Sequence, residues 1–562
     1  MNSVPETPAS PSPAGASSRR RRWLRHFLWT LAFLVTATAL FYAIEDFRGW
    51  RAWRQEVARL KQNGEPLTWA EIVPPMPPEA ENLAFAPPFK GLLDYRLPPL
   101  PSRFAPPAHA EGSWEEALKK AKVELAPPGY GKLPELVVWF RGQRVDLSAW
   151  ARHFHQPKLP KQVKVRFPAA PKGAAPAEQV LAALQLYAPR MAAIRRACRR
   201  PCARFPVHYE ENFTALLPHL EVLHDYGRLF TLHGVAELRR GNTAAALADL
   251  EVLFKLRTAL HDEPLLISQL VRAALHQGLL QLVWEGMTEH RWSPRDLERI
   301  RAALASDNFL SDFVWGIRGE RIGAVNTLEQ MCEGRLSVAA FFSLTATTPE
   351  SLYGFIPDGW IRQNMVRLSR FYRELGEVGD TNRFQVDWAA LEAINQHARE
   401  GRITPYNFFA KLMAPALKTV FRRAVATQAG SHLALTARAL EQRFQKTGAY
   451  PESLEALTSG DLPRWMHDPF DDHPLRYRRS APDACLLYSV GSNLRDDDGT
   501  PRQARQPDTV GDLIWRLPAS SSGSKPEAEQ RLPHPRPRAD RRSGSRRGAR
   551  LTDGPGLGPT GD

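Results

Sequence analysis

Cysteine is scarce in this sequence, with four residues among 562. So few cysteines exclude the dense disulfide framework that stabilises small secreted domains. Only Cys198 and Cys202 lie close together, and no second Cys or His pair follows at the spacing of a zinc site. A local disulfide across the loop that contains Pro201 stays open, but two free thiols near the end of a helix are the favoured interpretation.

Sequence motifs of the common enzyme classes are absent as well. The chain has no zinc-protease His-Glu-x-x-His, no nucleophile elbow, no phosphate-binding Gly-Lys-Ser/Thr loop and no dinucleotide-binding glycine pattern after a predicted strand. We therefore expect no enzyme activity. One alternative, a metal-dependent hydrolase in the helical body, stays open because two His-Asp dipeptides on predicted helices resemble the metal ligands of HD-type phosphohydrolases. The residues concerned are His224, Asp225, His261 and Asp262, with His219 and Asp249 nearby.

A basic surface of the kind that binds nucleic acid is not indicated, although the formal net charge is +15. Residues 1–26 contain five Arg and one Glu, and residues 519–562 contain nine Lys or Arg and five acidic residues. Much of the excess charge therefore lies at the two ends, and the region between them lacks a clustered basic stripe. We expect no nucleic-acid partner, and we expect a disordered basic N-terminus (1–22) and a disordered basic tail (519–562).

One long apolar run is present. Residues 27–44 are 18 consecutive uncharged and mostly apolar residues, which as a helix would span roughly 27 Å, close to the hydrocarbon thickness of a bilayer. Five arginines between Arg19 and Arg25 precede the run, and Glu45 and Asp46 follow it. By the positive-inside rule we expect a single-pass anchor at 23–46 in the inner (cytoplasmic) membrane, with a cytoplasmic N-terminus and a periplasmic body.

Other interpretations of this run stay open. A cleaved signal peptide could end near Ala37 or Ala39, and Arg20 and Arg21 faintly resemble a twin-arginine signal. A buried helix of a soluble protein is a further alternative. No second apolar run of comparable length occurs, which excludes a channel or transporter formed by one chain.

Beyond the anchor, the sequence divides by composition. Residues 66–107 contain twelve prolines, which prevent long helices and favour extended backbone. We expect residues 47–176 to form a Pro-rich stalk, or a strap packed on the body, with a short strand at 135–140 and a short helix capped by Asp146 or Ser148. A helical body (177–420) and a small module (421–518) should follow.

The sequence of the body predicts a mainly α fold, in the form of an irregular helical bundle. Around 216–238, apolar or small residues recur at steps of three and four, and a Gly241-Asn242 break leads into a second helical stretch. Residues ~230–258 therefore resemble one tetratricopeptide-like hairpin. Because no second copy appears one period later, we expect a single hairpin inside a bundle and not a peptide-binding superhelix.

The stretch 262–287 is almost entirely apolar and predicts a helix deep in the bundle, with Asp262 as its cap. Further helices are predicted near 293–306, 308–333, 360–375, 387–400, 405–420 and 421–447. In the buried helix we expect the few polar residues to be satisfied by internal hydrogen bonds and not used for catalysis. These residues are Ser268, Gln269, Arg272, His276 and Gln277.

The C-terminal module has a defined order of elements: a long helix, Tyr-Pro with two leucines, Asp-Pro, two aromatic strands and an acidic glycine loop. A third strand at 511–517 could close a small antiparallel sheet. Over residues ~421–499 this order resembles the globular part of the major pseudopilins of type II secretion, which implies a small α+β cap. The matching residues are Tyr450, Pro451, Leu454, Leu457, Asp468, Pro469, Tyr477, Tyr488, Ser489, Gly491 and Asp496 to Gly499.

The resemblance to the pseudopilins is partial. The pilin processing signal is absent before Phe27, so polymerisation as a pilin is not expected. In the pseudopilins the acidic loop binds calcium, and here Asn493, Asp496 and Asp498 could begin to supply the oxygen ligands. A solvated turn without metal is the alternative. We expect no cofactor other than this calcium ion.

Taken whole, the chain resembles a family of single-pass bacterial envelope proteins. The resemblance rests on the anchor and on the segments PPEAENLAFAPPF, HDEPLLISQLVR, DPFDDHPLRYRR and LYSVGSNLRDDDG. It implies a location but no particular activity. We therefore expect a membrane-anchored extracytoplasmic protein that acts by binding or scaffolding and has a protein partner.

Overall fold

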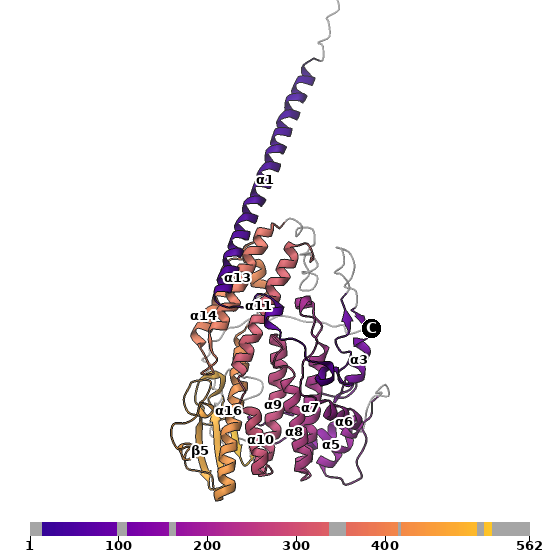
Figure 1. The fold of residues 1–562 in the computed structure, drawn as a ribbon, viewed down its shortest axis with the longest axis vertical. Coiled ribbons are helices and arrows are strands. Elements are labelled where there is room, and N and C mark those ends of the chain that lie inside the picture. The colour runs from indigo at the N-terminus through magenta and orange to yellow at the C-terminus, as the bar shows by residue number, and fades with distance from the viewer. Residues whose placement is uncertain are drawn as a thin grey trace, which may run out of the picture. The chain divides into compact units, whose positions relative to one another are not determined.

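The protein is described here by a computed structural model, which covers residues 14–97, 110–156, 165–336, 356–413, 417–502 and 511–519. These residues form a mainly helical protein with a small antiparallel sheet near the C-terminus, which confirms the predicted fold class (Figure 1). Residues 1–13 and 520–562, where most of the two predicted disordered ends fall, lie outside the described residues. The described part of the N-terminal segment, from Ala14, is helical.

The elements have the following bounds. The helices are α1 (Ala14–Gln62), α2 (Trp69–Ile72), α3 (Trp114–Ala121), α4 (Leu147–Phe154), α5 (Pro176–Leu184), α6 (Ala188–Ala197), α7 (Pro218–Arg239), α8 (Thr243–Thr258), α9 (Leu266–Thr288), α10 (Pro294–Leu304), α11 (Phe309–Cys332), α13 (Asp358–Glu377), α14 (Trp388–Arg399), α15 (Phe408–Met413) and α16 (Lys418–Thr447). The strands are β1 (Tyr95–Arg96), β2 (Glu111–Gly112), β3 (Gly379–Asp380), β4 (Gln385–Val386), β5 (Arg476–Ala481), β6 (Ala484–Ser489) and β7 (Leu513–Leu517).

The predicted membrane segment is part of one long helix, α1. An 18-residue window of this helix has a mean hydropathy of 2.0, and none of that window is buried by the rest of the protein. Its apolar side chains are exposed, for example Phe33 with 71% of its surface accessible. The N-terminal region thus contains a helix that is long and apolar enough to cross a membrane.

The same helix continues into the body. Residues 47–62, which were predicted to belong to the Pro-rich segment, instead extend α1 and pack along α13. Buried positions recur at steps of four and seven residues, at Glu45, Gly49, Glu56 and Leu60, which is the spacing of one helix face. Residues 47–62 contain no proline, so nothing stops the helix where the apolar run ends.

Two glycines allow α1 and α13 to approach closely. A Cβ atom at Gly49 would stand 2.3 Å from the carbonyl oxygen of Gly359, and a Cβ atom at Gly359 would stand 1.9 Å from a backbone oxygen of α1. The Gly359 N–H donates to Asp46 Oδ1 at 2.7 Å, where the N-terminus of α13 favours a negative charge. Farther along, the buried Glu56 accepts from Arg370 Nε at 3.0 Å. The helix α1 is therefore fixed to the body by backbone contact as well as by an ion pair.

The Pro-rich segment packs on the body as a strap. Leu83, Phe89 and Tyr95 are buried in the same hydrophobic core as the helices. Asn82 is fully buried and holds the segment in place: its Nδ2 donates to the Arg204 carbonyl at 2.7 Å, and its Oδ1 accepts from the Arg204 N–H at 2.8 Å. Of the two predicted forms, strap and stalk, the structure has the strap.

The strand predicted at 135–140 does not form. This segment is buried but irregular, and the N–H groups of Val138 and Trp139 both donate to Gln281 Oε1 at 2.7 Å. A side chain of α9 therefore satisfies the donors that a neighbouring strand would have satisfied. The short helix after it is present as α4, and Asp146 is its cap, accepting from the Ala149 N–H at 2.9 Å.

The helical body agrees with the predicted hairpin, α7 followed by α8. Gly241 has a positive φ of 85° in the turn, and Asn242 caps α8 through its side chain. The buried helix α9 packs across this hairpin, close enough that a Cβ at Gly234 would stand 2.7 Å from Leu282. The predicted cap of α9 is wrong, because α9 begins beyond Leu265 and Asp262 instead accepts from Arg204.

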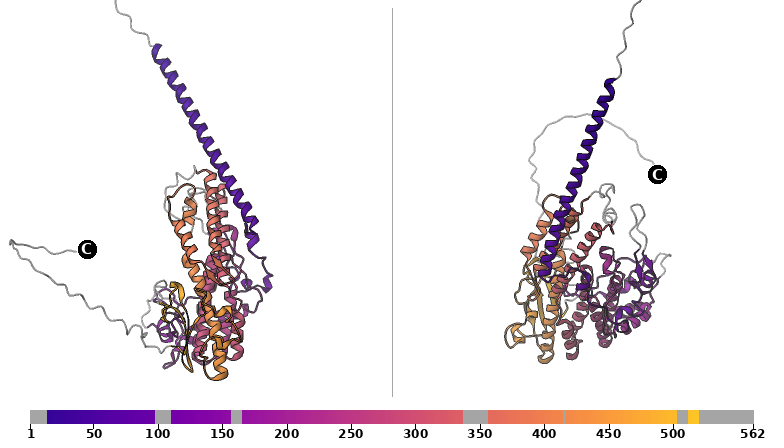
Figure 2. Two further views of the ribbon diagram at one scale, coloured as in Figure 1. Left: turned by 90° about the vertical axis from the view of Figure 1, so that its left-hand side faces the viewer. Right: turned by 45° about the horizontal axis from the view of Figure 1, so that its top comes forward.

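The C-terminal module contains the predicted elements. α16 ends at Gly448, whose φ of 73° is left-handed, as is common where glycine ends a helix. Strands β5, β6 and β7 form an antiparallel sheet in that order, which lies against α16 (Figure 2). The module shares its core with the body: Trp515 of β7 lies 5.3 Å from Trp139, ring centre to ring centre, and Trp284 of α9 donates to a β7 carbonyl at 3.1 Å.

Candidate functional site

The three predicted calcium ligands lie in the acidic loop after β6, which begins with a short 3-10 turn. Each of their side chains has a protein partner. The pairs are Asn493 Nδ2 with Asp497 Oδ2 (2.7 Å), Asp498 Oδ1 with Arg478 Nη1 (3.1 Å) and Asp496 Oδ2 with Arg476 Nε (3.6 Å).

Two further carboxylates, Asp497 and Asp512, close this loop, and neither was among the predicted calcium ligands. The side chain of Asp512 is fully buried and accepts from the N–H groups of Gly499 at 2.8 Å and Asp497 at 3.3 Å. Asp497 in turn accepts from the Gly511 N–H at 2.6 Å. Burial raises the pKa of Asp512 to about 7, because the charged form is poorly solvated there. The acidic loop is thus tied to the start of β7 by its own carboxylates.

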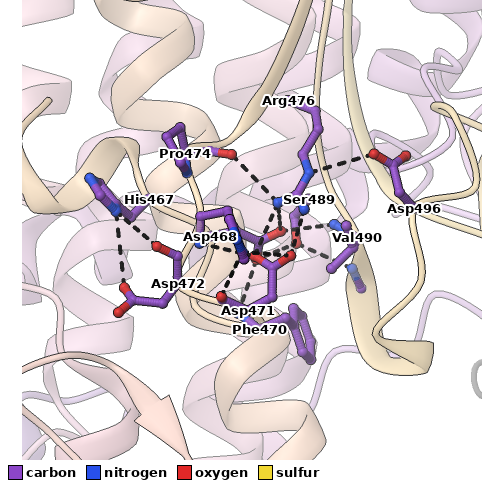
Figure 3. Close-up of polar contacts among 12 residues, drawn as sticks. His467, Asp468, Phe470, Asp471, Asp472, Pro474, Arg476, Ser489, Val490 and Asp496 are labelled. Carbon is purple, nitrogen blue, oxygen red and sulfur yellow. Dashed lines mark hydrogen bonds and ion pairs between the residues drawn. The ribbon is translucent and has the colours of Figure 1, made fainter.

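A second buried carboxylate, Asp468, joins the Asp-Pro loop to the end of β6 (Figure 3). Its Oδ1 accepts from Ser489 Oγ at 2.9 Å and from the Phe470 N–H at 3.0 Å. Its Oδ2 accepts from the Val490 N–H at 2.8 Å. Burial raises the pKa of Asp468 to about 6, although these hydrogen bonds favour the charged form. Asp468 therefore fixes two loops that are remote in sequence.

Arg476 connects the two acidic regions (Figure 3). It donates two hydrogen bonds to Asp471, at 3.0 and 2.5 Å, and its Nη1 lies 3.5 Å from Asp468 Oδ2. Its Nε faces Asp496 across 3.6 Å. A guanidinium can hold several carboxylates at once because it carries five donors in one plane. Among the described residues, no group of three or more His, Cys, Asp or Glu side chains is arranged to hold a metal ion.

The His-Asp dipeptides of the body are not brought together into one set of ligands. His261 Nδ1 lies 2.7 Å from Asp262 Oδ1, and both are half exposed. His219 is fully buried and contacts Glu263 at 3.0 Å. Asp249 contacts His233 Nδ1 at 2.5 Å. The polar residues of these helices have separate partners, and among the residues described none of them forms a shared metal centre.

The polar residues of α9 have internal partners, as predicted. Ser268 donates to Glu263 at 2.6 Å, Gln269 donates to the Leu260 carbonyl at 3.0 Å, and Arg272 pairs with Asp312. Gln277 accepts from Trp139 Nε1. His276 contacts Arg257 and Ser431.

The structure reveals a Ser-His-Asp grouping that the sequence could not show. Ser431 Oγ lies 2.9 Å from His276 Nε2 and donates to Asp307 Oδ2 at 3.1 Å. Arg257 Nη1 lies 2.9 Å from His276 Nδ1. Because arginine only donates, Nδ1 must be the acceptor, and the proton of the neutral imidazole is on Nε2.

This grouping does not have the roles of a catalytic triad. His276 presents a proton to Ser431 and so cannot accept one from it, whereas a general base must accept the proton of the nucleophile. Burial and the neighbouring arginines hold the pKa of His276 well below its usual value. Ser431 and His276 both have no accessible surface. The three side chains act as a hydrogen-bonded link between α9, α16 and the end of α10.

A groove of about 500 Å³ lies between α7, α9, α16 and the C-terminal module. Its lining includes apolar side chains such as Trp139, Phe140 and Leu513. The described residues that line it include no Asp or Glu, and its basic residues come from three separate parts of the chain. These are His224, Arg228, Arg422, Arg423 and Arg502, and we call this surface the arginine groove.

The charge of the arginine groove comes from its guanidinium groups. Burial and Arg228 lower the pKa of His224, so the imidazole is neutral at pH 7. The carboxylate that acts on Arg228 is Asp225, one turn away on α7 and outside the lining, and burial raises the pKa of Asp225 to about 6. Arg502 also lies over the Phe140 ring at 5.2 Å. The groove therefore offers positive charge next to apolar surface, which suits an anionic partner with an apolar part.

Comparisons with known proteins add no assignment to these sites: no family model matches the chain, and neither a curated protein nor a solved structure matches it.

Proposed function

We propose that the chain is a single-pass protein of the inner membrane, with a cytoplasmic N-terminus and a periplasmic body, and that the body acts by binding or scaffolding. The observation that carries the proposal is α1: no residue in its apolar window is buried, whereas the next four turns pack on α13. An exposed apolar helix of this length fits the hydrocarbon layer of a bilayer.

The continuous helix also supports a scaffolding role. Because one helix both crosses the bilayer and packs in the body, the body would be held at a fixed distance and angle from the membrane. A flexible linker at this point would allow the body to rotate freely. No such linker separates the apolar run from the buried positions that begin at Glu45.

The arginine groove supports a binding role. In this groove, positive charge from three chain segments lies next to apolar side chains. We propose that it receives an anionic segment of a partner protein, since guanidinium groups bind carboxylates by paired hydrogen bonds.

The membrane topology is tested on the full chain. A reporter that is active only outside the cytoplasm, fused after Asp562, should be active, and a reporter that works only in the cytoplasm should be inactive at the same position. The protein should stay in the membrane after carbonate extraction. Recovery of a soluble, shortened product would instead support cleavage near Ala39.

The binding role is tested by cross-linking in membranes and recovery of partners. Arg423→Glu, in the arginine groove, should reduce recovery of the cross-linked partner. Arg295→Glu makes the same charge change at an exposed position on α10, outside the groove, and should not. Equal recovery with both variants would contradict a role of the groove.

A further inference from the structure

A chain of aromatic contacts leads from the anchor helix to a loop of the body. Phe41 lies inside the apolar run of α1, and its ring stands 6.0 Å from Trp360 in α13, nearly edge to face. Trp360 stands 6.0 Å from Tyr406, in the loop between α14 and α15. The Arg48 guanidinium lies 6.0 Å from the Tyr406 ring centre. These contacts place the loop 400–407 beside the point where α1 leaves the body.

The depth of these residues relative to a bilayer follows from the helix. Phe41 precedes the end of the apolar run, Ile44, by three residues, which is about 4.5 Å along the helix axis. Trp360, which contacts Phe41, therefore lies within about one helical turn of the level at which the hydrocarbon layer ends. Arg48, one turn beyond Ile44, lies at the level of the headgroups.

The exposed chemistry of this region fits that depth. Ile403, at the tip of the loop, has 68% of its surface accessible, and Leu412 in α15 has 44%. The rings of Trp360 and Tyr406 are half-buried, so part of each is accessible. Tryptophan and tyrosine concentrate at the headgroup level of membranes, because one end of the ring system is apolar and the other is polar.

We propose that the end of the body formed by Trp360 and the loop 400–407 lies in the interfacial layer of the bilayer that α1 crosses, with Ile403 inserted among the lipids. The proposal rests on the proposed membrane anchor. This contact would be a second one between protein and lipid. The body would then touch the membrane surface directly at this end, in addition to its connection through α1. Figure 2 shows this end of the bundle beside the emerging part of α1.

Photochemical labelling of the full chain in phospholipid vesicles tests the proposal. A photoreactive benzoylphenylalanine residue replaces one of three side chains: Phe33 in the span, Ile403 in the loop, or Lys446 at the far end of α16, which is 30 residues long. All three positions are exposed, so the replacement should not disturb the core. After irradiation, phospholipid adducts are counted by mass spectrometry.

We expect adducts at Phe33 and Ile403 and only background at Lys446. Labelling of Phe33 with background at Ile403 would overturn the inference and leave the anchor intact. Background at Phe33 would overturn the anchor itself, and with it the inference. A melting temperature equal to that of the parent protein, measured before irradiation, shows that each variant is folded.

Discussion

Single buried carboxylates position the loops of the C-terminal module. Asp468 and Asp512 have no accessible surface, and each accepts hydrogen bonds from backbone N–H groups of loops that would otherwise have no partner. Each of these hydrogen bonds adds only modestly to the free energy of unfolding. Removing the acceptor costs more, because a buried N–H donor is then left unsatisfied. Their effects are therefore expected to be large for single residues.

Replacing Asp468 by alanine should destabilise the protein strongly. The change leaves the N–H groups of Phe470 and Val490 without an acceptor in a buried place, at a cost of about 1–3 kcal/mol for each group. Chemical unfolding should show a free energy of unfolding lower by roughly 3 kcal/mol. Asp461→Ala, at an exposed position nearby, should change it by no more than about 0.5 kcal/mol. Similar values for both variants would show that Asp468 is dispensable.

The stability conferred by Asp512 should depend on pH. Its folded pKa, about 7, lies above the value of an exposed aspartate, so the folded state holds the proton more tightly than the unfolded state does. The resulting stability is complete below about pH 4 and is lost as the pH rises through the folded pKa. Asparagine cannot ionise, so the free energy of unfolding of the parent should fall relative to that of Asp512→Asn between pH 4 and pH 8. A difference that stays constant over this range would refute the raised pKa.

At the scale of elements, the contact between α1 and α13 depends on small residues. Gly359→Ala would place a Cβ atom 1.9 Å from a backbone oxygen of α1, so the two helices must separate. Overpacking of this kind costs about 1–3 kcal/mol. We expect a lower melting temperature and faster hydrogen exchange in residues 45–60 of α1.

A matched glycine separates this effect from the general cost of the substitution. Gly131 has no atom within 4 Å of its would-be Cβ. Gly131→Ala should therefore leave both the melting temperature and the exchange rates unchanged. If Gly359→Ala behaves like Gly131→Ala, the helices are not in close contact.

The acidic loop is expected to hold its shape without a metal ion. Arg476 and Arg478 neutralise Asp496 and Asp498, and backbone donors occupy Asp497 and Asp512. Calorimetry of the full chain with millimolar calcium, the range of weak extracellular sites, should give no binding heat and no rise in melting temperature. Heat that disappears in Asp496→Ala would establish the calcium site instead.

At the scale of the whole molecule, the body and the C-terminal module form one folding unit. One hydrophobic cluster extends from Leu83 in the strap to Leu517 in β7, and residues 1–520 form one compact unit. The boundary predicted near residue 420 therefore marks a change in sequence composition. The residues on its two sides share one hydrophobic core. We expect the body to fail to fold when the sheet of the module is removed.

Two truncations test this expectation. Ending the chain at Gly448 removes the sheet and exposes the core face of α9 and α16, and the product should be insoluble or lack a cooperative thermal transition. Ending it at Ser520 keeps every described residue, so it should leave the melting temperature unchanged. A cooperative transition in the shorter product would show that the body folds alone.

Local patterns in the sequence determined much of this fold. The apolar run predicted the exposed part of α1, and the steps of three and four predicted α7. The almost entirely apolar stretch predicted α9, and the aromatic strands predicted β5 and β6. The cap of α4, Asp146, which accepts from the Ala149 N–H, was one of the two candidates predicted for that helix. These features depend on residues only a few positions apart, so short windows of sequence contain the physical information.

Tertiary packing decided the rest. The segment 135–140 has the composition of a strand, but Gln281, more than 140 residues away, takes its backbone donors. Asp468 accepts a hydrogen bond from Val490. Ser431 contacts His276 and Asp307, which come from separate regions of the chain. A hydrogen bond between distant residues depends on how whole elements pack, and no short stretch of sequence contains that geometry. The sequence therefore determined where helices and strands form, and only the tertiary structure decided which buried polar groups meet.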